Sequence, residues 1–347
     1  MAKIISTAKA VPPYKVDREI AKEYAYLHFK SKFRDIDRLV QVFESSRIDS
    51  RYFCVPKEWF FTPKCFQEKN DTYIEWATKL GAEASQKCLD LAGLTPQDVD
   101  YIIFVSTTGL STPSIDARLI NILHMRSDIR RTPIWGLGCV GGAAGLSMAF
   151  NYIKAFPDAK VLLVAVELCG LTFNFNDLSK SNLVATAIFA DGAAAVLLGN
   201  DGDGPEILAT QSTIWPDSLD IMGWNFHNEG MQVVFAKAIP AIVHKYTREN
   251  ISSFLGKHGS SIDKLDYFLI HPGGARVVDA YKESLGLNNG ELQIAEAVLR
   301  DYGNMSAVTI LYMLDEFLKA DYKNPGALGL MTALGPGFSS ESLLFKI

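Results

Sequence analysis

The chain of 347 residues is 48% hydrophobic and 21% charged, a composition typical of a globular protein with a substantial core. Its 34 basic and 39 acidic residues give a net charge of −5 with histidine neutral. Because there is no basic surplus to bind a phosphate backbone, nucleic acid is not expected as a partner. The five cysteines form no CxxC pair, so we expect no structural zinc and free thiols in a reducing compartment.

The N-terminal segment 1–25 carries only a short apolar stretch before a proline pair and charged residues. It lacks the 7–15-residue apolar core of a signal peptide. No apolar run reaches the roughly 18 residues of a membrane span. The sequence therefore indicates a cytoplasmic protein without a transmembrane segment.

The first half of the chain contains a set of elements that recurs in the second half. Residues 91–109, LAGLTPQDVDYIIFVSTTG, indicate a helix end, a short acidic loop and a buried strand. Cys139 lies 38 positions after Tyr101 and is followed by a small-residue helix. An apolar strand at 159–168 and a glycine turn into a last apolar strand at 193–199 complete the set.

The second half repeats these elements at nearly the same spacing. Residues 255–274, LGKHGSSIDKLDYFLIHPGG, give the same order of helix end, loop and strand. Asn304 lies 37 positions after Tyr267. The elements that follow are a helix and two strands, at 305–320, 326–335 and 342–347. The matching intervals indicate an internal duplication.

We interpret the repeat as two α/β halves, residues 1–205 and 206–347, each with a mixed sheet and a central helix. Strands this uniformly apolar need cover on both faces, so the two sheets are expected to enclose helices between them. Cys139 and Asn304 then occupy equivalent corners, and His271 ends a strand. Pseudo-twofold packing would bring the three side chains together. The alternative is an unduplicated doubly wound fold.

Cys139 is the candidate nucleophile. It lies in WGLGCVGGAAG, where glycines permit a sharp strand-to-helix turn and close approach of the backbone. A thiol at a helix N-terminus is favoured as the thiolate, and we expect pairing with His271 to lower its pKa further. Three other cysteines are interpreted as small buried hydrophobic residues: Cys54, Cys65 and Cys88.

His271 and Asn304 are the candidate partners of that thiol. His271 ends an apolar strand and precedes a Pro-Gly-Gly turn, which we expect to hold its side chain at the edge of a site. Its ring can pair with a thiolate and also donate a hydrogen bond. Asn304, in DYGNMSA, is a residue type favoured at a helix N-cap. Its side-chain amide beside the histidine would also make an oxyanion hole for a thioester or an enolate. The sequence has no GxSxG, P-loop, GxGxxG or metal-spaced cluster.

Together these motifs resemble the type III polyketide synthases, the chalcone synthase-like enzymes of the thiolase superfamily. The resemblance runs along nearly the whole chain, through RIDSRY, STTGLSTPS, WGLGCVGG, VELCGLTF, AIFADGAAA, HPGG, YGNMSA and LGPGFSSE. The pattern is most similar to the bacterial alkylpyrone and alkylresorcinol synthases. It implies a thiolase-like duplicated αβαβα five-layer sandwich, a homodimer, no permanently bound cofactor, and coenzyme A thioesters as substrates.

The resemblance also implies roles for single residues. Cys139 matches the nucleophile that holds the growing chain, while His271 and Asn304 match the pair that drives malonyl-CoA decarboxylation and stabilises the oxyanion. Phe189 matches an aromatic gatekeeper between the coenzyme A tunnel and the cavity. Other positions match the product pocket or its walls: Glu167, Cys169, Thr172, Ser306, Gly335, Pro336, Gly337, and Thr112, which is expected to reach the partner's cavity.

Some positions depart from the family pattern. Val233 stands where the family has a second gatekeeper phenylalanine, although Phe235 lies two positions on. Arg38 matches one basic contact to the coenzyme A phosphates, whereas Ser45 replaces another. Two nearby residues are further candidates for this contact, Arg47 and Arg51.

We therefore expect an acyltransferase that extends a fatty acyl-CoA with malonyl-CoA by decarboxylative Claisen condensation. The small side chains of Cys169 and Val233 favour a long apolar starter, released as alkylpyrones or alkylresorcinols. One alternative is a ketoacyl synthase III-type enzyme of fatty-acid initiation, against which the HPGG turn and the GPG loop argue. Hydroxymethylglutaryl-CoA synthase chemistry would need a further acid at the site. A non-catalytic protein on the same fold is the alternative from another class.

Overall fold

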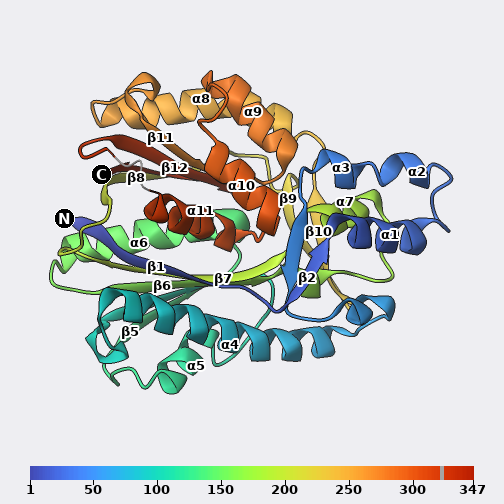
Figure 1. The fold of residues 1–347 in the computed structure, drawn as a ribbon, viewed down its shortest axis with the longest axis horizontal. Helices are drawn as coiled ribbons and strands as arrows, with labels where there is room; N and C mark the ends of the chain where they lie inside the picture. Colours follow the sequence, from blue (N-terminus) through green and yellow to red (C-terminus); the bar gives the residue numbers. More distant parts are fainter. Residues whose placement is uncertain (321–323) are drawn as a thin grey trace.

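Nine strands form one mixed sheet in which two sets of strands share the same arrangement (Figure 1). The computed structural model describes residues 1–320 and 324–347, and in them the strand order is β11-β12-β13-β8-β1-β7-β6-β4-β5. The first set comprises β1 (Ala2–Ala10), β4 (Tyr101–Val105), β5 (Arg130–Ile134), β6 (Val161–Leu168) and β7 (Asp191–Gly199). The second set comprises β8 (Glu206–Ile214), β11 (Tyr267–Ile270), β12 (Leu328–Gly335) and β13 (Ser339–Lys346).

Strand directions match between the two sets. β4 runs parallel to β6, β6 antiparallel to β7, and β7 antiparallel to β1. In the same way β11 runs parallel to β12, β12 antiparallel to β13, and β13 antiparallel to β8. This correspondence confirms the predicted duplication and leaves β5 as an extra edge strand of the first set.

Helices form three layers around the strands (Figure 1). α6 (Gly141–Ala155) and α11 (Ala307–Lys319) lie between the two sets. α4 (Phe66–Ala92) and α5 (Ile115–Ile122) cover the outer face of the first set, and α8 (Ile239–Lys257) and α9 (Ala275–Leu285) cover that of the second. The predicted αβαβα sandwich is confirmed. No helix within the described part of the chain is long and apolar enough to cross a membrane.

The two predicted sheets are joined to each other along one edge. β1 and β8 pair antiparallel at Ala2 with Ile207 and at Lys3 with Glu206, which joins the two sets by hydrogen bonds. Each of these strands would otherwise leave an unpaired edge. The start of β8 falls at the boundary predicted between residues 205 and 206, but it lies inside a continuous sheet, so the division into 1–205 and 206–347 stays a prediction.

Smaller elements gather at one end of the layers, on the right in Figure 1. They include two strand pairs, β2 (Tyr14–Asp17) with β3 (Ser50–Phe53) and β9 (Met222–His227) with β10 (Gly230–Phe235). Four helices accompany them, α1 (Arg18–Phe29), α2 (Ile36–Leu39), α3 (Val42–Ser45) and α7 (Lys180–Ile188). α10 (Gln293–Tyr302) precedes α11 in the chain and packs against it.

The two central helices approach each other closely at the start of α6. A Cβ atom on Gly142 would collide with the carbonyl oxygen of Ala307 and lie 2.7 Å from Cγ2 of Ile310. A Cβ atom on Gly141 would lie 2.6 Å from Cγ1 of Val105. Glycine is therefore required where α6 begins, since any side chain would push the helix away from α11 and β4.

Gly142→Ala should lower the free energy of unfolding by about 1–3 kcal/mol, because the added methyl group overpacks the crossing of α6 and α11. Gly256→Ala in α8 is the matched control, since a Cβ atom there would meet no atom of the described residues within 4 Å beyond its own helix backbone and chain neighbours. It should leave stability unchanged or raise it by about 0.5–1 kcal/mol. Urea unfolding of both variants measures the difference, and equal stabilities would contradict this account of the crossing.

Candidate active site

Cys139 lies at the turn between β5 and α6. It belongs to a short 3-10 turn, Gly138–Val140, and its side chain is 5% exposed. Gly138 has a φ of 53°, which glycine adopts without strain. A Cβ atom there would lie 2.8 Å from Cδ of Pro336. The predicted elbow is thus present, and the loop at residues 335–337 packs directly against it.

Asn304 lies between α10 and α11, and hydrogen bonds fix both ends of its amide. Oδ1 accepts from the Ser306 N–H at 2.8 Å, and Nδ2 donates to the carbonyl oxygen of Gly273 at 3.0 Å. The Asn304 side chain also forms a hydrogen bond with Cys139, which opposes the rise in the pKa of the thiol. The hydroxyl of Ser306 lies 3.6 Å from Sγ of Cys139. The N-cap position of α11 belongs to Ser306 rather than to Asn304.

His271 directly follows β11, as predicted, and its backbone N–H donates to Thr332 of β12 at 2.9 Å. The side chain is 3% exposed, and neither ring nitrogen has a hydrogen-bond partner among the described residues. Burial lowers the pKa of His271 to about 4, so the ring is neutral at pH 7. Unpartnered buried nitrogens are costly unless a ligand satisfies them, which marks this ring as a binding group.

The structure brings the three predicted catalytic residues to one site. Asn304 connects the His271 turn, through Gly273, to Ser306, which contacts Cys139. The expected pairing of Cys139 with His271 is absent, because neither ring nitrogen has a hydrogen-bond partner among the described residues. Burial raises the pKa of the Cys139 thiol to about 12, with Glu167 adding to the rise and Ser306 opposing it. The expectation of a lowered thiol pKa is therefore wrong for this state: the thiol is desolvated, and both groups are neutral.

Glu167, in β6, is buried close to Cys139. Its carboxyl accepts from the Thr107 N–H at 3.0 Å and from the Thr108 hydroxyl at 2.8 Å. The Thr107 hydroxyl in turn accepts from the Gly138 N–H at 3.0 Å. Burial raises the pKa of Glu167 to about 7, although the two threonines oppose the rise. Glu167 thus supports the elbow and gains or loses a proton near neutral pH beside the nucleophile.

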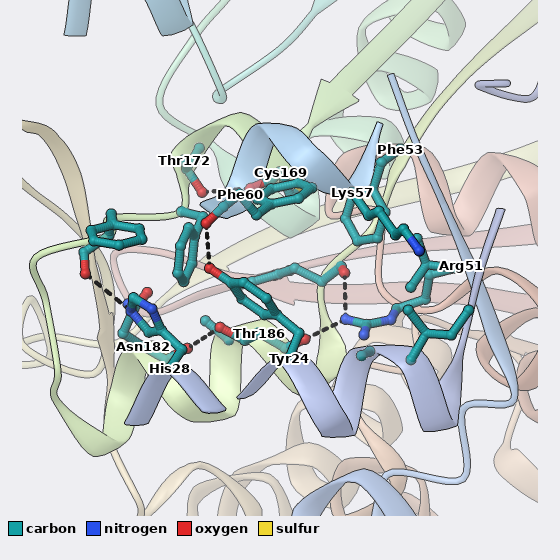
Figure 2. A pocket seen from close by; sticks show the side chains of 18 of the residues that line it. Tyr24, His28, Arg51, Phe53, Lys57, Phe60, Cys169, Thr172, Asn182 and Thr186 are labelled. Atoms are coloured by element: carbon teal, nitrogen blue, oxygen red, sulfur yellow. Dashed lines mark hydrogen bonds between the residues drawn. The ribbon is translucent and has the colours of Figure 1, made fainter. Parts of the chain in front are cut away.

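A cavity of about 490 Å³ lies between α1, α7, β3 and the turn at Cys169–Thr172 (Figure 2). Its volume is within the range of small-molecule sites. Cys169, two positions after Glu167, lines it, and the Cys139 thiol lies close enough to Cys169 to help raise its pKa. The walls are dominated by aromatic side chains: Tyr24, Phe53, Phe60, Phe61, Phe173, Phe175, Phe189 and Trp224.

Four of the predicted pocket residues line this cavity: Cys169, Thr172, Phe189 and Val233. Phe235 packs against the ring of Phe189 instead, with ring centroids 5.6 Å apart. The other predicted pocket residues lie outside the cavity lining. Glu167 and Ser306 are beside Cys139, the loop 335–337 covers the elbow, and Thr112 is exposed.

The three candidate phosphate contacts are in different surroundings. Arg38 is exposed and pairs with an aspartate three residues before it. Arg47 is exposed and forms two hydrogen bonds with the carboxylate of Asp279, at 2.8 and 2.9 Å. Arg51 is 3% exposed, and Nη1 donates to carbonyl groups at the end of α7. Arg51 also lines the cavity, so its role as a phosphate contact stays a prediction.

Sequence reasoning missed most of the cavity wall. α1 contributes Ile20, Tyr24, Leu27 and His28, yet no family motif falls on this helix. His28 is half-buried, and its Nε2 lies 3.0 Å from the carbonyl oxygen of Phe175. The one available signal was the density of aromatic residues in 52–61 and 173–175.

Glu167→Gln should raise stability relative to the wild type by an amount that grows with pH. The folded-state pKa of about 7 lies above the ordinary value of 4.5, so the wild type loses stability as pH rises from about 4.5 to about 7, and the variant does not. Because one pKa unit corresponds to about 1.36 kcal/mol, the difference in free energy of unfolding between variant and wild type reaches about 3 kcal/mol above pH 7. Melting temperatures at pH 5 and pH 8 measure it, and a pH-independent gap would contradict the shift.

Comparisons with known proteins agree with this geometry. Models of the chalcone and stilbene synthases match the chain, the N-terminal domain over residues 1–202 and the C-terminal domain over 206–347. A Bacillus subtilis (strain 168) protein named "Putative chalcone synthase" is 45% identical, with 100% of this chain and 99% of that protein aligned. A 1,3,6,8-tetrahydroxynaphthalene synthase of Streptomyces peucetius subsp. caesius is 37% identical over 87% of this chain and 81% of its own length.

Among solved structures, that of 1,3,6,8-tetrahydroxynaphthalene synthase from Streptomyces coelicolor A3(2), a bacterial type III polyketide synthase, has a TM-score of 0.96 at 28% identity, with 99% of each chain covered. The chain therefore belongs to the chalcone and stilbene synthase family and is a type III polyketide synthase, an acyltransferase that condenses coenzyme A thioesters.

Proposed function

We propose that this enzyme condenses a long-chain fatty acyl-CoA starter with malonyl-CoA and releases alkylpyrones or alkylresorcinols. The observation that carries the proposal is the aromatic cavity that Cys169 and Phe189 line beside the Cys139 site. A largely apolar cavity stabilises an extended aliphatic chain by removing it from water. Charged side chains occur in its lining only as Glu23, Arg51 and Lys57 within the described residues.

Cys139 is the proposed nucleophile in starter loading. Its thiol proton passes to the neutral ring of His271 while the sulfur attacks the starter thioester. A new carbon–sulfur bond forms, the bond to coenzyme A breaks, and the coenzyme A thiolate takes the proton from His271. The two unpartnered ring nitrogens of His271 support this role, because one can accept the proton while the other donates to a substrate oxygen.

His271 and Asn304 are the proposed groups for decarboxylation and condensation. Malonyl-CoA loses carbon dioxide, and the electron pair moves into an enolate whose oxygen accepts hydrogen bonds from both side chains. The enolate carbon attacks the Cys139 thioester, a carbon–carbon bond forms, and the thiolate leaves and is reprotonated. After two extensions, attack of an enol oxygen on the thioester expels the thiol and yields a pyrone. After three extensions, closure through carbon with loss of water, followed by hydrolysis of the thioester and loss of carbon dioxide, yields a resorcinol.

Substrate binding divides between two regions in this proposal. The starter chain occupies the cavity past Phe189, next to Cys169, Thr172 and Val233. Arg38 and Arg47 are the preferred candidate contacts to the coenzyme A phosphates, since both guanidinium groups are exposed. Arg47 would have to exchange the Asp279 carboxylate for a phosphate, a replacement of one anion by another.

We further propose a homodimer in which Thr112 approaches the partner's cavity. β5 is an edge strand of the sheet, and such edges are ordinarily paired or protected. Leu110 and Trp135 near it are 41% and 47% exposed, and the Trp135 ring lies 5.9 Å from that of Phe226, itself 53% exposed. Apolar groups gathered in this way favour a protein interface. All five cysteines are free thiols, which favours a reducing compartment, the cytoplasm.

Given malonyl-CoA, the purified enzyme should prefer palmitoyl-CoA over coumaroyl-CoA, with alkylpyrones or alkylresorcinols identified by mass spectrometry. Ala185→Phe fills part of the cavity wall and should shift the preference toward shorter acyl-CoAs. Lys180→Phe, an exposed position on the same helix, is the matched control and should keep the wild-type preference. A preference of the wild type for coumaroyl-CoA would overturn the proposed starter.

Analytical ultracentrifugation should give the molecular mass of a dimer for the wild type. The double variant Leu110→Asp/Trp135→Asp should shift it toward monomer, because charge is placed on the proposed apolar interface. Leu91→Asp, at a 69% exposed position at the end of α4, is the control and should remain dimeric. A monomeric wild type would refute the proposed assembly.

A further inference from the structure

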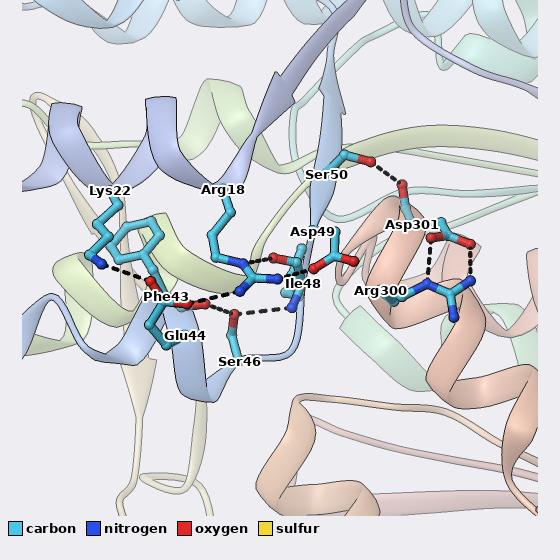
Figure 3. A network of polar contacts seen from close by, with 10 residues as sticks. All are labelled: Arg18, Lys22, Phe43, Glu44, Ser46, Ile48, Asp49, Ser50, Arg300 and Asp301. Carbon is cyan, nitrogen blue, oxygen red and sulfur yellow. Dashed lines mark hydrogen bonds and ion pairs between the residues drawn. The ribbon is translucent and has the colours of Figure 1, made fainter.

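β3 is tied to the end of α10, just ahead of the turn that carries Asn304. The Asp49 N–H donates to the carbonyl oxygen of Arg300 at 2.8 Å, and the Ser50 hydroxyl donates to that of Asp301 at 3.0 Å. Figure 3 shows these residues together, with Arg18 of α1 bound to Asp49 and to the carbonyl oxygen of Ile48. These hydrogen bonds therefore fix the start of β3 relative to the end of α10 that precedes Asn304.

Arg51, the next residue of β3, extends its side chain beneath the end of α7. Nη1 donates to the carbonyl oxygen of Thr186 and, at 3.1 Å, to that of Phe189 (Figure 2). A cation at a helix C-terminus interacts favourably with the helix dipole and binds carbonyl groups that lack a partner in the helix. Arg51 thus caps α7 from inside the protein.

The stem of Arg51 also contacts the residue before Asn304. A Cβ atom on Gly303 would lie 2.9 Å from Cγ of Arg51, and Gly303 has a φ of 74°. The backbone of Asn304 pairs with the same end of α7, because its N–H donates to Ile188 at 2.9 Å and its carbonyl oxygen accepts from Ala190 at 2.9 Å. Arg51 therefore touches both sides of the junction between α7 and Asn304.

The charge of Arg51 is buried without a carboxylate partner among the described residues. Burial lowers its pKa to about 10, so the guanidinium stays charged at neutral pH. Among the described residues no carboxylate forms an ion pair with it, and a buried charge without a counter-ion costs free energy. What the guanidinium does provide is geometry, because its planar group of donors fixes two carbonyl groups at once.

We propose that Arg51 is a positioning residue that sets the orientation of Asn304 and of Phe189 by fixing the end of α7 against the Gly303–Asn304 turn. This inference rests on the proposed function, in which Asn304 acts in malonyl-CoA decarboxylation while Cys139 takes up the starter. The side chain of Arg51 touches neither the thiol nor the ring of His271 within the described contacts. Its effect therefore reaches the chemistry only through Asn304 and Phe189.

The test separates the two half-reactions in Arg51→Met and Arg51→Lys. Acylation of Cys139 by palmitoyl-CoA is followed by intact mass, and carbon dioxide release from radiolabelled malonyl-CoA is followed separately. A misplacement of the amide by about 1 Å should lower carbon dioxide release about ten- to hundredfold in Arg51→Met and leave acylation within about twofold of wild type. Arg51→Lys should fall between, since lysine keeps the charge but not the planar group of donors.

Three further variants complete the design. Arg300→Met removes an exposed guanidinium that, among the described residues, bonds Asp301 alone, and it should change neither half-reaction. Asn304→Ala is the reference for loss of the amide. The double variant Arg51→Met/Asn304→Ala should release carbon dioxide no more slowly than Asn304→Ala alone, because Arg51 affects decarboxylation through that residue.

Parallel loss of acylation and carbon dioxide release in the Arg51 variants, or additive losses in the double variant, would show a merely structural role and overturn the inference. If Arg51→Met does not fold, Arg51→Lys and the double variant with lysine decide by the same criteria. Undiminished carbon dioxide release in Asn304→Ala would instead refute the proposed role of Asn304. Normal release in both Arg51 variants beside a defective Asn304→Ala would refute the role of Arg51 alone.

Discussion

The close contact of α6 with α11 is the constraint on which the rest of the site depends. Gly141 and Gly142 have no room for a side chain against Val105 and Ala307, so the two helices meet at the ends that carry the chemistry. Because the two repeats have the same strand order, the residues just before each central helix arrive at one point. Cys139 comes from the first repeat, and Asn304 comes from the second.

Exclusion of water is the second feature that shapes the site. Burial is the largest cause of the raised pKa values of Cys139, Glu167 and Asp191, and of the lowered pKa of His271. Each shift favours the neutral form of the group. Cys139 and His271 therefore hold little charge in the resting site, and charge develops there when a thioester enters and a proton moves. Groups whose pKa values are strongly shifted by their surroundings are common in active sites.

Much of this arrangement could be predicted from the sequence, because it is carried by short motifs at matching intervals. The duplication placed Cys139, His271 and Asn304 at strand and helix ends, and the structure brings the three together. The pairing of β1 with β8 could not be foreseen, since edge strands carry no local signal of their partner. The same holds for the wall that α1 contributes to the cavity and for Arg51, whose value lies in contacts with residues 135 or more positions away.

The electrostatic prediction failed for a related reason. A glycine elbow before a helix indicates a reactive thiol, but whether that thiol is ionised depends on solvent and partners. In this site Glu167 lies nearby, and the hydrogen bond to His271 is not formed. The local sequence predicts the elbow, but the groups that surround the thiol belong to segments that are distant in the sequence.

The most direct measurement of the central claim is the mass of the intact enzyme after incubation with palmitoyl-CoA alone, followed by peptide mapping. The account predicts the addition of one palmitoyl group, located on the peptide that contains Cys139 and absent from Cys139→Ala. Acylation of Cys54, Cys65, Cys88 or Cys169 in its place, or no acylation of the folded wild type by any acyl-CoA tested, would contradict it.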